Sequence, residues 1–308
     1  MKAENEALFL AFLNRHDDEA WSAILDSLSP AIHEVDRNAT RIWHYFFPLA
    51  LQRALSGASD LPALVRKLFL DGSYLLSTQI DSSHWFLYGH RYWPDVKRAV
   101  LDYVASESAP PSLELTSQIQ DVAARVARQV GADVSLIVGI TAVAFMTLQQ
   151  VGVEAFRSSP GTVTLSPRFH EQPPDEIVRR RKQPERQSLT DILRGRKFYT
   201  VTFDERLDDA TFRVIHGQEL TTGAYRDKPY YTWHDPRCKE GEGPIPVQCR
   251  SASCGTCWVG VLAGAENLSP VGRLEAMRMK VFGYIESDEP RPLIRLACQA
   301  QAYGRATI

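Results

Sequence analysis

The sequence predicts an α+β protein of two domains, in which a helical N-terminal domain precedes a mixed C-terminal domain. Three observations support this prediction. Apolar residues recur at helical spacing through the first half of the chain, without clear strand-type alternation. A segment rich in proline, glycine and basic residues follows, and after it FYTVTF (198–203) has the pattern of a strand. We expect the helical domain at 1–157, a linker at 158–196 and the mixed domain at 197–308.

The helical domain is expected to be a bundle of roughly six to eight helices. Prolines and one glycine mark its internal boundaries. Pro48 should kink or restart a helix, and Pro62 and Pro94 should each lie in a first helical turn. Asp60 is a candidate N-cap, and Gly131 should separate the last two helices.

The most apolar run, VSLIVGITAVAFMTL (134–148), has 15 residues. A membrane-spanning helix needs roughly 20 apolar residues, so we expect no transmembrane segment. The run is expected to be a buried helix or, if a membrane partner exists, a re-entrant or interface segment. The N-terminus lacks the pattern of a secretory signal, because its apolar stretch is short and flanked by acidic residues. A cytoplasmic location is therefore expected.

Two aromatic clusters of the helical domain, IWHYFF (42–47) and SSHWFLYGHRYW (82–93), contain His44, His84 and His90. They permit two interpretations. One is a second cofactor, such as a haem with two axial imidazoles. The other is an aromatic core with hydrogen-bonded histidines, or an aromatic docking face for a partner. No CxxCH motif is present, which excludes the usual covalent attachment of haem.

The linker contains a basic run, Arg179 to Lys182. Four charges are few for binding nucleic acid or anionic lipid, so a solvated linker or a contact to the acidic N-terminal domain is the preferred interpretation. No nucleic-acid partner is expected. SLTDIL (188–193) is expected to form one helical turn before the first strand of the mixed domain.

Cys249, Cys254, Cys257 and Cys298 carry the clearest chemical signal of the chain. Their spacing, Cys-x4-Cys-x2-Cys followed by a distant cysteine, places four thiolates around a [2Fe–2S] cluster. Small residues fill the loop between the first three, as a backbone that wraps a cluster closely requires. A structural zinc site is the competing interpretation, although zinc ribbons normally supply two matched cysteine pairs.

The segment from Phe198 to Ile308 resembles the plant-type and related bacterial [2Fe–2S] ferredoxin domain. The resemblance rests on FYTVTF, on ATFRVIHGQEL (210–220), on IPVQCRSASCGTCWVGVLAG (245–264) and on RLACQAQAYGRATI (295–308). It implies a β-grasp fold in which the four cysteines bind the cluster.

The sequence departs from the ferredoxin pattern at two places. Ala252 stands where the family usually has glycine, and it fits comfortably only if its φ is negative. The stretch between Gly217 and Cys249 is about twice the usual length and contains the fifth cysteine, Cys238. Cys238 is interpreted as a buried thiol, with a substitute ligand or a redox-active thiol as alternatives. Four cysteines committed to iron indicate a reducing compartment.

Charge is unevenly distributed. Residues 1–164 carry 13 Lys and Arg against 18 Asp and Glu, whereas 197–308 carry 14 against 14. A neutral domain lacks the field that steers a freely diffusing acidic carrier, which favours a tethered carrier with a dedicated partner.

No GxGxxG motif, P-loop or other enzyme motif accompanies the cysteines, so the sequence predicts no catalytic residue and does not indicate an enzyme. The predicted function is one-electron transfer, as a ferredoxin-type carrier or electron-input subunit. The helical domain would dock a redox partner, namely a reductase, an oxidase or a membrane complex. Two alternatives remain: a cluster-based redox sensor or adaptor, and a helical domain whose own cofactor the cluster feeds.

Overall fold

The structure is a computed structural model of the chain. It describes residues 2–68, 70, 74–106, 114–165, 171–187, 191, 195–207, 209–226, 231–282, 284 and 289–308.

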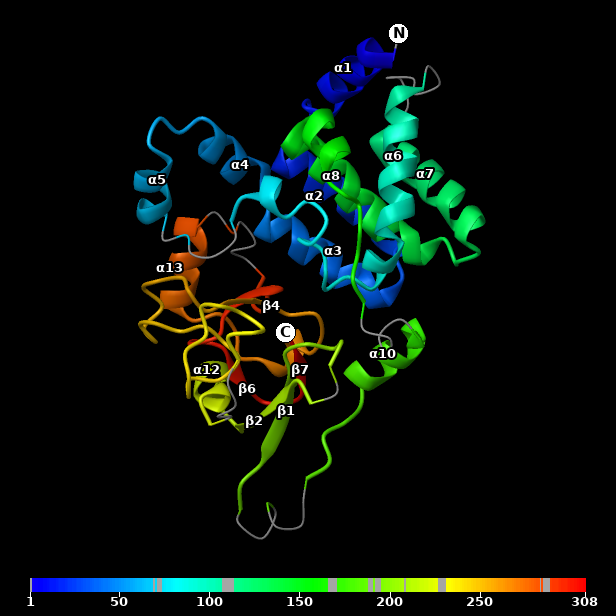
Figure 1. Ribbon diagram of the computed structural model, residues 1–308. Helices are drawn as coiled ribbons and strands as arrows, with labels where there is room; N and C mark the ends of the chain where they lie inside the picture. The colour runs from blue at the N-terminus through cyan, green and yellow to red at the C-terminus, as the bar shows by residue number, and fades with distance from the viewer. Residues whose placement is uncertain are drawn as a thin grey trace. The chain divides into compact units, whose positions relative to one another are not determined.

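The chain forms two compact units (Figure 1). The first comprises Met1–Ala58 and Leu75–Ser166, and the second comprises Ser59–Tyr74 and Pro167–Ile308. The N-terminal region is mostly helical, as the periodicity predicted. This division does not follow the domain limits predicted from the sequence, since it groups the short segment Ser59–Tyr74 with the second unit. The predicted limits therefore stay predictions.

The first unit is built from helices. They are α1 (Lys2–Leu13), α2 (Asp18–Leu28), η1 (Ser29–Ala31), α3 (Glu34–Phe46), α4 (Leu49–Ser56), η2 (Leu76–Thr78), η3 (Tyr88–Tyr92), α6 (Trp93–Ala105), α7 (Leu115–Val130) and α8 (Ser135–Ser158).

The helix boundaries follow the local signals. Pro48 is the N-cap residue of α4, so it restarts the helix after α3. Asp60 accepts a hydrogen bond from the Ala63 amide and caps α5 (Leu61–Lys67), which has Pro62 in its first turn. Pro94 lies in the first turn of α6. Gly131 ends α7 in the left-handed conformation, with φ 69°.

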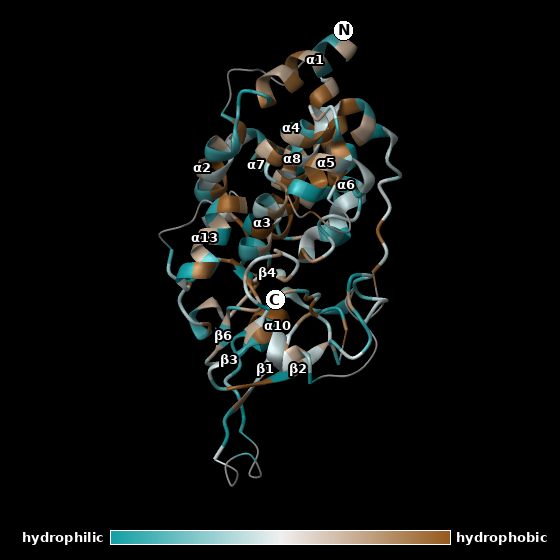
Figure 2. Cartoon of the chain, turned by 90° about the vertical axis from the view of Figure 1, so that its left-hand side faces the viewer, coloured by the Kyte–Doolittle hydropathy of each residue, from teal (hydrophilic) through white to brown (hydrophobic). Residues whose placement is uncertain are grey.

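Helix α8 is the core of the first unit. Every side chain from Leu136 to Gln149 is buried, and the helix packs against α3, α6 and α7. Figure 2 shows its hydrophobic character. By length and composition α8 could cross a membrane, but 78% of its most apolar window is buried inside the structure, as in the core helix of a globular domain.

The second unit contains short strands and helices. Its elements are α5, α10 (Pro174–Arg181), β1 (Phe198–Thr202), β2 (Thr211–Ile215), β3 (Gln218–Glu219), α12 (Leu220–Ala224), β4 (Trp258–Gly260), η4 (Ala265–Asn267), α13 (Arg273–Phe282), β5 (Ile294–Leu296), β6 (Gln301–Ala302) and β7 (Ala306–Thr307).

The described strands form three small sheets. β1 pairs with β2 as an antiparallel hairpin and with β7 in parallel, while β3 pairs with β6 and β4 with β5. FYTVTF therefore opens the sheet, and ATFRVIHGQEL supplies the second strand and the turn into α12, as predicted. Their apolar side chains meet in one core that includes Val201, Val214, Leu220 and Leu296.

The predicted linker is partly ordered against the second unit. The basic run lies at the end of α10 and just after it, and the Arg181 guanidinium is buried in an ion pair with Glu205, 2.6 Å away. Gln187 donates to and accepts from the backbone of Phe198, and Glu185 accepts from the Thr200 amide, so these side chains satisfy part of β1. The helical turn expected at 188–193 lies, except for Asp191, outside the described residues.

The buried histidines of the first unit do not form a common site. His84 and His90 bind each other through their Nδ1 atoms, 2.7 Å apart, which leaves no space for an iron between the two rings. His84 also packs on Trp93, with ring centroids 4.0 Å apart. Nε2 of His44 instead lies 3.8 Å from the Asp18 carboxylate. This arrangement favours the aromatic-core interpretation for His84 and His90.

The buried histidine pair predicts a loss of stability in acid. Burial, and next the neighbouring His90 ring, lower the pKa of His84 well below its usual value. Below about pH 6.5 the unfolded chain therefore binds a proton that the folded chain does not, and the free energy of unfolding falls by up to about 1.4 kcal/mol per pH unit. Urea unfolding followed by helical circular dichroism between pH 7 and 5 measures this slope.

His84→Phe keeps a ring against Trp93 and removes the titration, so it should flatten the slope. Equal slopes in the two proteins would show that His84 gains its proton as readily in the folded chain as in the unfolded one.

Candidate functional site

The loop from Cys249 to Cys257 has an unusual backbone. Arg250, Ala252 and Gly255 all have positive φ, at 54°, 59° and 71°. Among the described residues, Arg250 and Ala252 are the non-glycine residues with this conformation. Such a path costs energy for residues with a Cβ, and here it turns successive N–H groups to one side of the loop.

Those N–H groups point at the first sulfur. The amides of Ser251, Ser253 and Cys254 donate to Sγ of Cys249 over 3.4, 3.3 and 3.3 Å. Burial alone would raise the pKa of Cys249, but hydrogen bonds from Ser253, Ser251 and Cys254 outweigh it and lower the pKa to about 5. The loop thus holds Cys249 as a thiolate, the form that binds metal.

The left-handed conformation of Ala252 corrects the expectation from the sequence that this alanine needs a negative φ. Ala252 is buried, and its amide donates to the sulfur of Cys298. The alanine therefore adopts the conformation of the glycine that it replaces, at a cost of about 1–2 kcal/mol in backbone strain. A hydrogen bond to a cluster ligand accompanies this strain.

Pairing of β4 with β5 brings the distant cysteine to the loop. Trp258 lies opposite Leu296, and the Ala297 amide donates to the Cys257 carbonyl over 3.0 Å. The pairing therefore brings Cys257, just before β4, close to Cys298, just after β5. The hydrogen bond from the Cys257 thiol lowers the pKa of Cys298 to about 6 and raises that of Cys257. Gln299 Nε2 also lies 3.5 Å from Sγ of Cys298.

The four cysteines thus form two hydrogen-bonded pairs. Cys249 pairs with Cys254, and Cys257 pairs with Cys298. Charge interactions join the pairs, between Cys249 and Cys298 and between Cys254 and Cys257. Within the described part of the chain, no three His, Cys, Asp or Glu side chains are close enough to hold one metal ion. Two neighbouring pairs of cysteines match a cluster of two irons with two thiolates on each.

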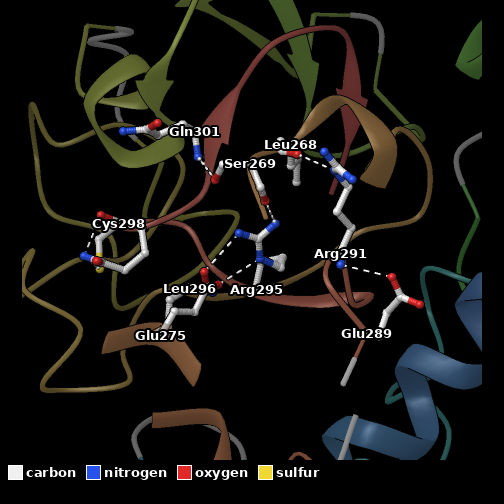
Figure 3. A network of polar contacts seen from close by, with 10 residues as sticks. Leu268, Ser269, Glu275, Glu289, Arg291, Arg295, Leu296, Cys298 and Gln301 are labelled. Atoms are coloured by element: carbon white, nitrogen blue, oxygen red, sulfur yellow. Dashed lines mark hydrogen bonds and ion pairs between the residues drawn. The ribbon is translucent and has the colours of Figure 1, made fainter. Parts of the chain in front are cut away.

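A buried ion pair fixes the strand that precedes Cys298. Nε and Nη2 of Arg295 donate to the two carboxylate oxygens of Glu275, both over 2.9 Å, and neither side chain is exposed. The same carboxylate accepts from the Leu296 amide, and Nη1 of Arg295 donates to the Ser269 carbonyl (Figure 3). Glu275 lies on α13, so the ion pair joins α13 to β5 three residues before Cys298.

Helix α13 also contacts the cysteine loop through its last residue. A Cβ at Gly255 would lie 2.6 Å from Cζ of Phe282, so only glycine lets this ring pack on the loop. The Trp258 ring packs edge-on against Phe282 and Tyr284. The site is thus supported by Glu275, Arg295 and Phe282. These residues could not be predicted from the sequence, because no local pattern links side chains so far apart in the chain.

Cys238 lies in the apolar core of the second unit. Burial, and next the Asp235 carboxylate, raise the pKa of its thiol to about 11. A thiol that keeps its proton at neutral pH is a poor nucleophile and a poor ligand. This environment supports the interpretation of Cys238 as a buried thiol.

Comparison with known proteins identifies the segment that contains the cysteines. Residues 231–303 match the family model of the 2Fe-2S iron-sulfur cluster binding domain. This range contains the four cysteines, so the C-terminal part carries a domain that binds a [2Fe–2S] cluster, as predicted. Neither the curated proteins nor the solved structures contain a match to the chain.

Backbone strain at Ala252 predicts that Ala252→Gly stabilises the second unit. Glycine removes about 1–2 kcal/mol of strain and loses about 0.4–1 kcal/mol through the freer unfolded chain, a net gain of about 0.5–1 kcal/mol. Urea unfolding followed by the visible absorbance of the cluster measures it. Ala300→Gly is the control, because Ala300 is equally buried and has no positive φ, so it should lower stability. A lower free energy of unfolding in both variants would show that the backbone at Ala252 is not strained.

Breaking the buried ion pair should be costly. Glu275→Gln keeps the shape but leaves the Arg295 charge uncompensated, so we expect a loss of about 3–5 kcal/mol and faster release of iron. Asp95→Asn is the matched control, because the side chains of the Asp95–Arg98 pair are 30% and 63% exposed and its loss costs about 0.5 kcal/mol or less. Thermal unfolding and iron release to a chelator measure both. Equal effects would show that burial adds nothing to the Glu275–Arg295 pair.

Proposed function

We propose that this chain is a one-electron transfer protein, a ferredoxin-type carrier or electron-input subunit. The convergence of four cysteines in two pairs within a cluster-binding domain carries the proposal. When bound, the cluster supplies a centre that accepts and returns a single electron. Exchange of this electron with another redox centre is the chemistry that such a centre supports.

In this proposal Cys249, Cys254, Cys257 and Cys298 hold the iron. The amides at Cys249 and the Gln299 side chain at Cys298 offset the negative charge on the sulfurs, which favours the reduced state. The apolar core beneath the loop excludes water on one side. The chain thereby sets the reduction potential through hydrogen bonds and burial.

A β-grasp fold for residues 197–308 is part of the proposal. In its support, β7 runs parallel to β1 beside the β1–β2 hairpin, and α12 packs on β2. The strands β4 and β5 pair separately; Cys257 directly precedes β4, and Cys298 lies two residues after β5.

The helical unit is proposed to dock the redox partner, a reductase, an oxidase or a membrane complex. Its support is the charge asymmetry, with 18 acidic against 13 basic residues in 1–164 and a balanced 197–308. A cytoplasmic location is consistent with five free cysteines. Size-exclusion chromatography of the full chain with each candidate partner tests this role.

Replacing any of the four cysteines tests the site. Cys249→Ser, Cys254→Ser, Cys257→Ser and Cys298→Ser should each lose or severely destabilise the cluster, because serine is a much weaker iron ligand than a thiolate. Iron and zinc analysis, with an EPR spectrum of the dithionite-reduced protein, measures the outcome.

Cys238→Ser is the matched control and should keep the iron content and the spectrum. An unaltered cluster after Cys298→Ser, or its loss after Cys238→Ser, would refute the proposed ligand set. A wild-type protein that retains its iron but takes up no electron would refute electron transfer.

A further inference from the structure

Helix α13 exposes apolar side chains next to the cluster domain's core. Leu274, Met277 and Val281 are 56%, 57% and 70% exposed. They stand at spacings i, i+3 and i+7, so they form one stripe along the helix. Helices that enter a hydrophobic groove of another protein use this same spacing for their anchors.

The opposite side of α13 is already occupied. Glu275 and Met279 are buried there, and Phe282 packs on Gly255 of the cysteine loop. The outward stripe is therefore not the face by which α13 folds onto its own domain. Large apolar side chains grouped on one exposed helix face are a feature of interaction sites.

The stripe lies close to the proposed redox centre. α13 reaches the cysteine loop through Phe282 and the strand before Cys298 through Glu275 and Arg295. A partner on the outer face would be separated from both cysteine-bearing segments by about one helix diameter, about 10–12 Å.

Basic residues flank the stripe on both sides. By helical geometry Arg278 lies on one side, and Arg273 and Lys280 lie on the other. No ion pair involves these three among the described residues, whereas the helix's one carboxylate, Glu275, is neutralised by Arg295. The outer face of α13 is therefore apolar in the centre and positive at its edges.

From these observations we infer that α13 is a second docking element, in addition to the docking proposed for the helical unit. Through it the cluster would exchange electrons with a redox protein whose surface facing α13 is an apolar groove rimmed by carboxylates. The inference rests on the proposed electron-transfer function. A second copy of this chain fits less well, because packing two α13 stripes together would bring like charges at Arg273, Arg278 and Lys280 into proximity.

One electron acceptor in two charge forms tests the inference. Native cytochrome c is basic, and full succinylation of its lysines makes it acidic. Each dithionite-reduced cluster would pass one electron to one ferric haem, with no bond or proton transferred. Stopped-flow rates with both forms are compared at low and high salt, using the full-length, cluster-loaded protein.

Two variants and their controls separate charge from apolar contact. Arg278→Glu with Lys280→Glu reverses the rim, and Arg196→Glu with Lys197→Glu makes the same charge change before β1. Leu274→Ser with Met277→Ser and Val281→Ser removes the stripe, and Leu207→Ser alters an exposed leucine elsewhere in the second unit.

We expect the acidic acceptor to react about tenfold faster than the basic one at low salt, and the rim variant to reverse that order. The stripe variant should slow the acidic acceptor severalfold at high salt, and both controls should match the wild type. Rates that the rim and stripe variants leave unchanged would overturn the inference. The inference would also be overturned if light scattering showed the wild-type protein to be a dimer and the stripe variant to be a monomer.

The reaction of the cluster with ferricyanide separates this inference from the proposed function. A reduced wild-type protein that cannot pass an electron even to ferricyanide refutes electron transfer itself. If the protein reacts normally with ferricyanide but the α13 variants do not change its rates with either form of cytochrome c, only the docking role of α13 is refuted.

Discussion

The buried ion pair between Glu275 and Arg295 is the interaction on which the cluster site depends most. Two charges without solvent are stable only when each is fully hydrogen-bonded, and here one carboxylate serves a guanidinium and a backbone amide at once. Because its partners lie on α13 and β5, the pair fixes the helix and the strand before Cys298 relative to each other. The position of the fourth sulfur follows from that constraint.

In the cysteine loop, the cost of backbone strain is offset by hydrogen bonds to the cysteine sulfurs. Positive φ at Arg250 and Ala252 is unfavourable for L-residues. The same turns direct three amides at Cys249 and that of Ala252 at Cys298, where they compensate negative charge in a partly buried site. The loop keeps its conformation because the surrounding core and the Phe282 ring leave it little alternative.

The helical unit follows a simpler rule, in which one apolar helix is enclosed by amphipathic ones. The side chains of α8 are buried through most of its length, so its composition resembles a membrane span although its environment is a protein core. Some of the polar groups enclosed with it satisfy one another. Gln149, for example, accepts from Trp21 and donates to the carbonyl of Leu13.

Features that depend on neighbouring residues could be predicted from the sequence alone. Asp60, Pro62 and Gly131 set helix ends because capping and backbone restrictions act within one turn. The cysteine spacing indicated the cofactor because three of the proposed ligands lie in one short loop.

Which distant groups meet could be seen only in the folded chain. The Glu275–Arg295 pair, the contact of His84 with His90 and the packing of Phe282 on Gly255 depend on the path of the chain between them. The same holds for the left-handed Ala252, since an alanine has no intrinsic preference for that conformation. Long-range packing imposed it, and local propensity could not show it.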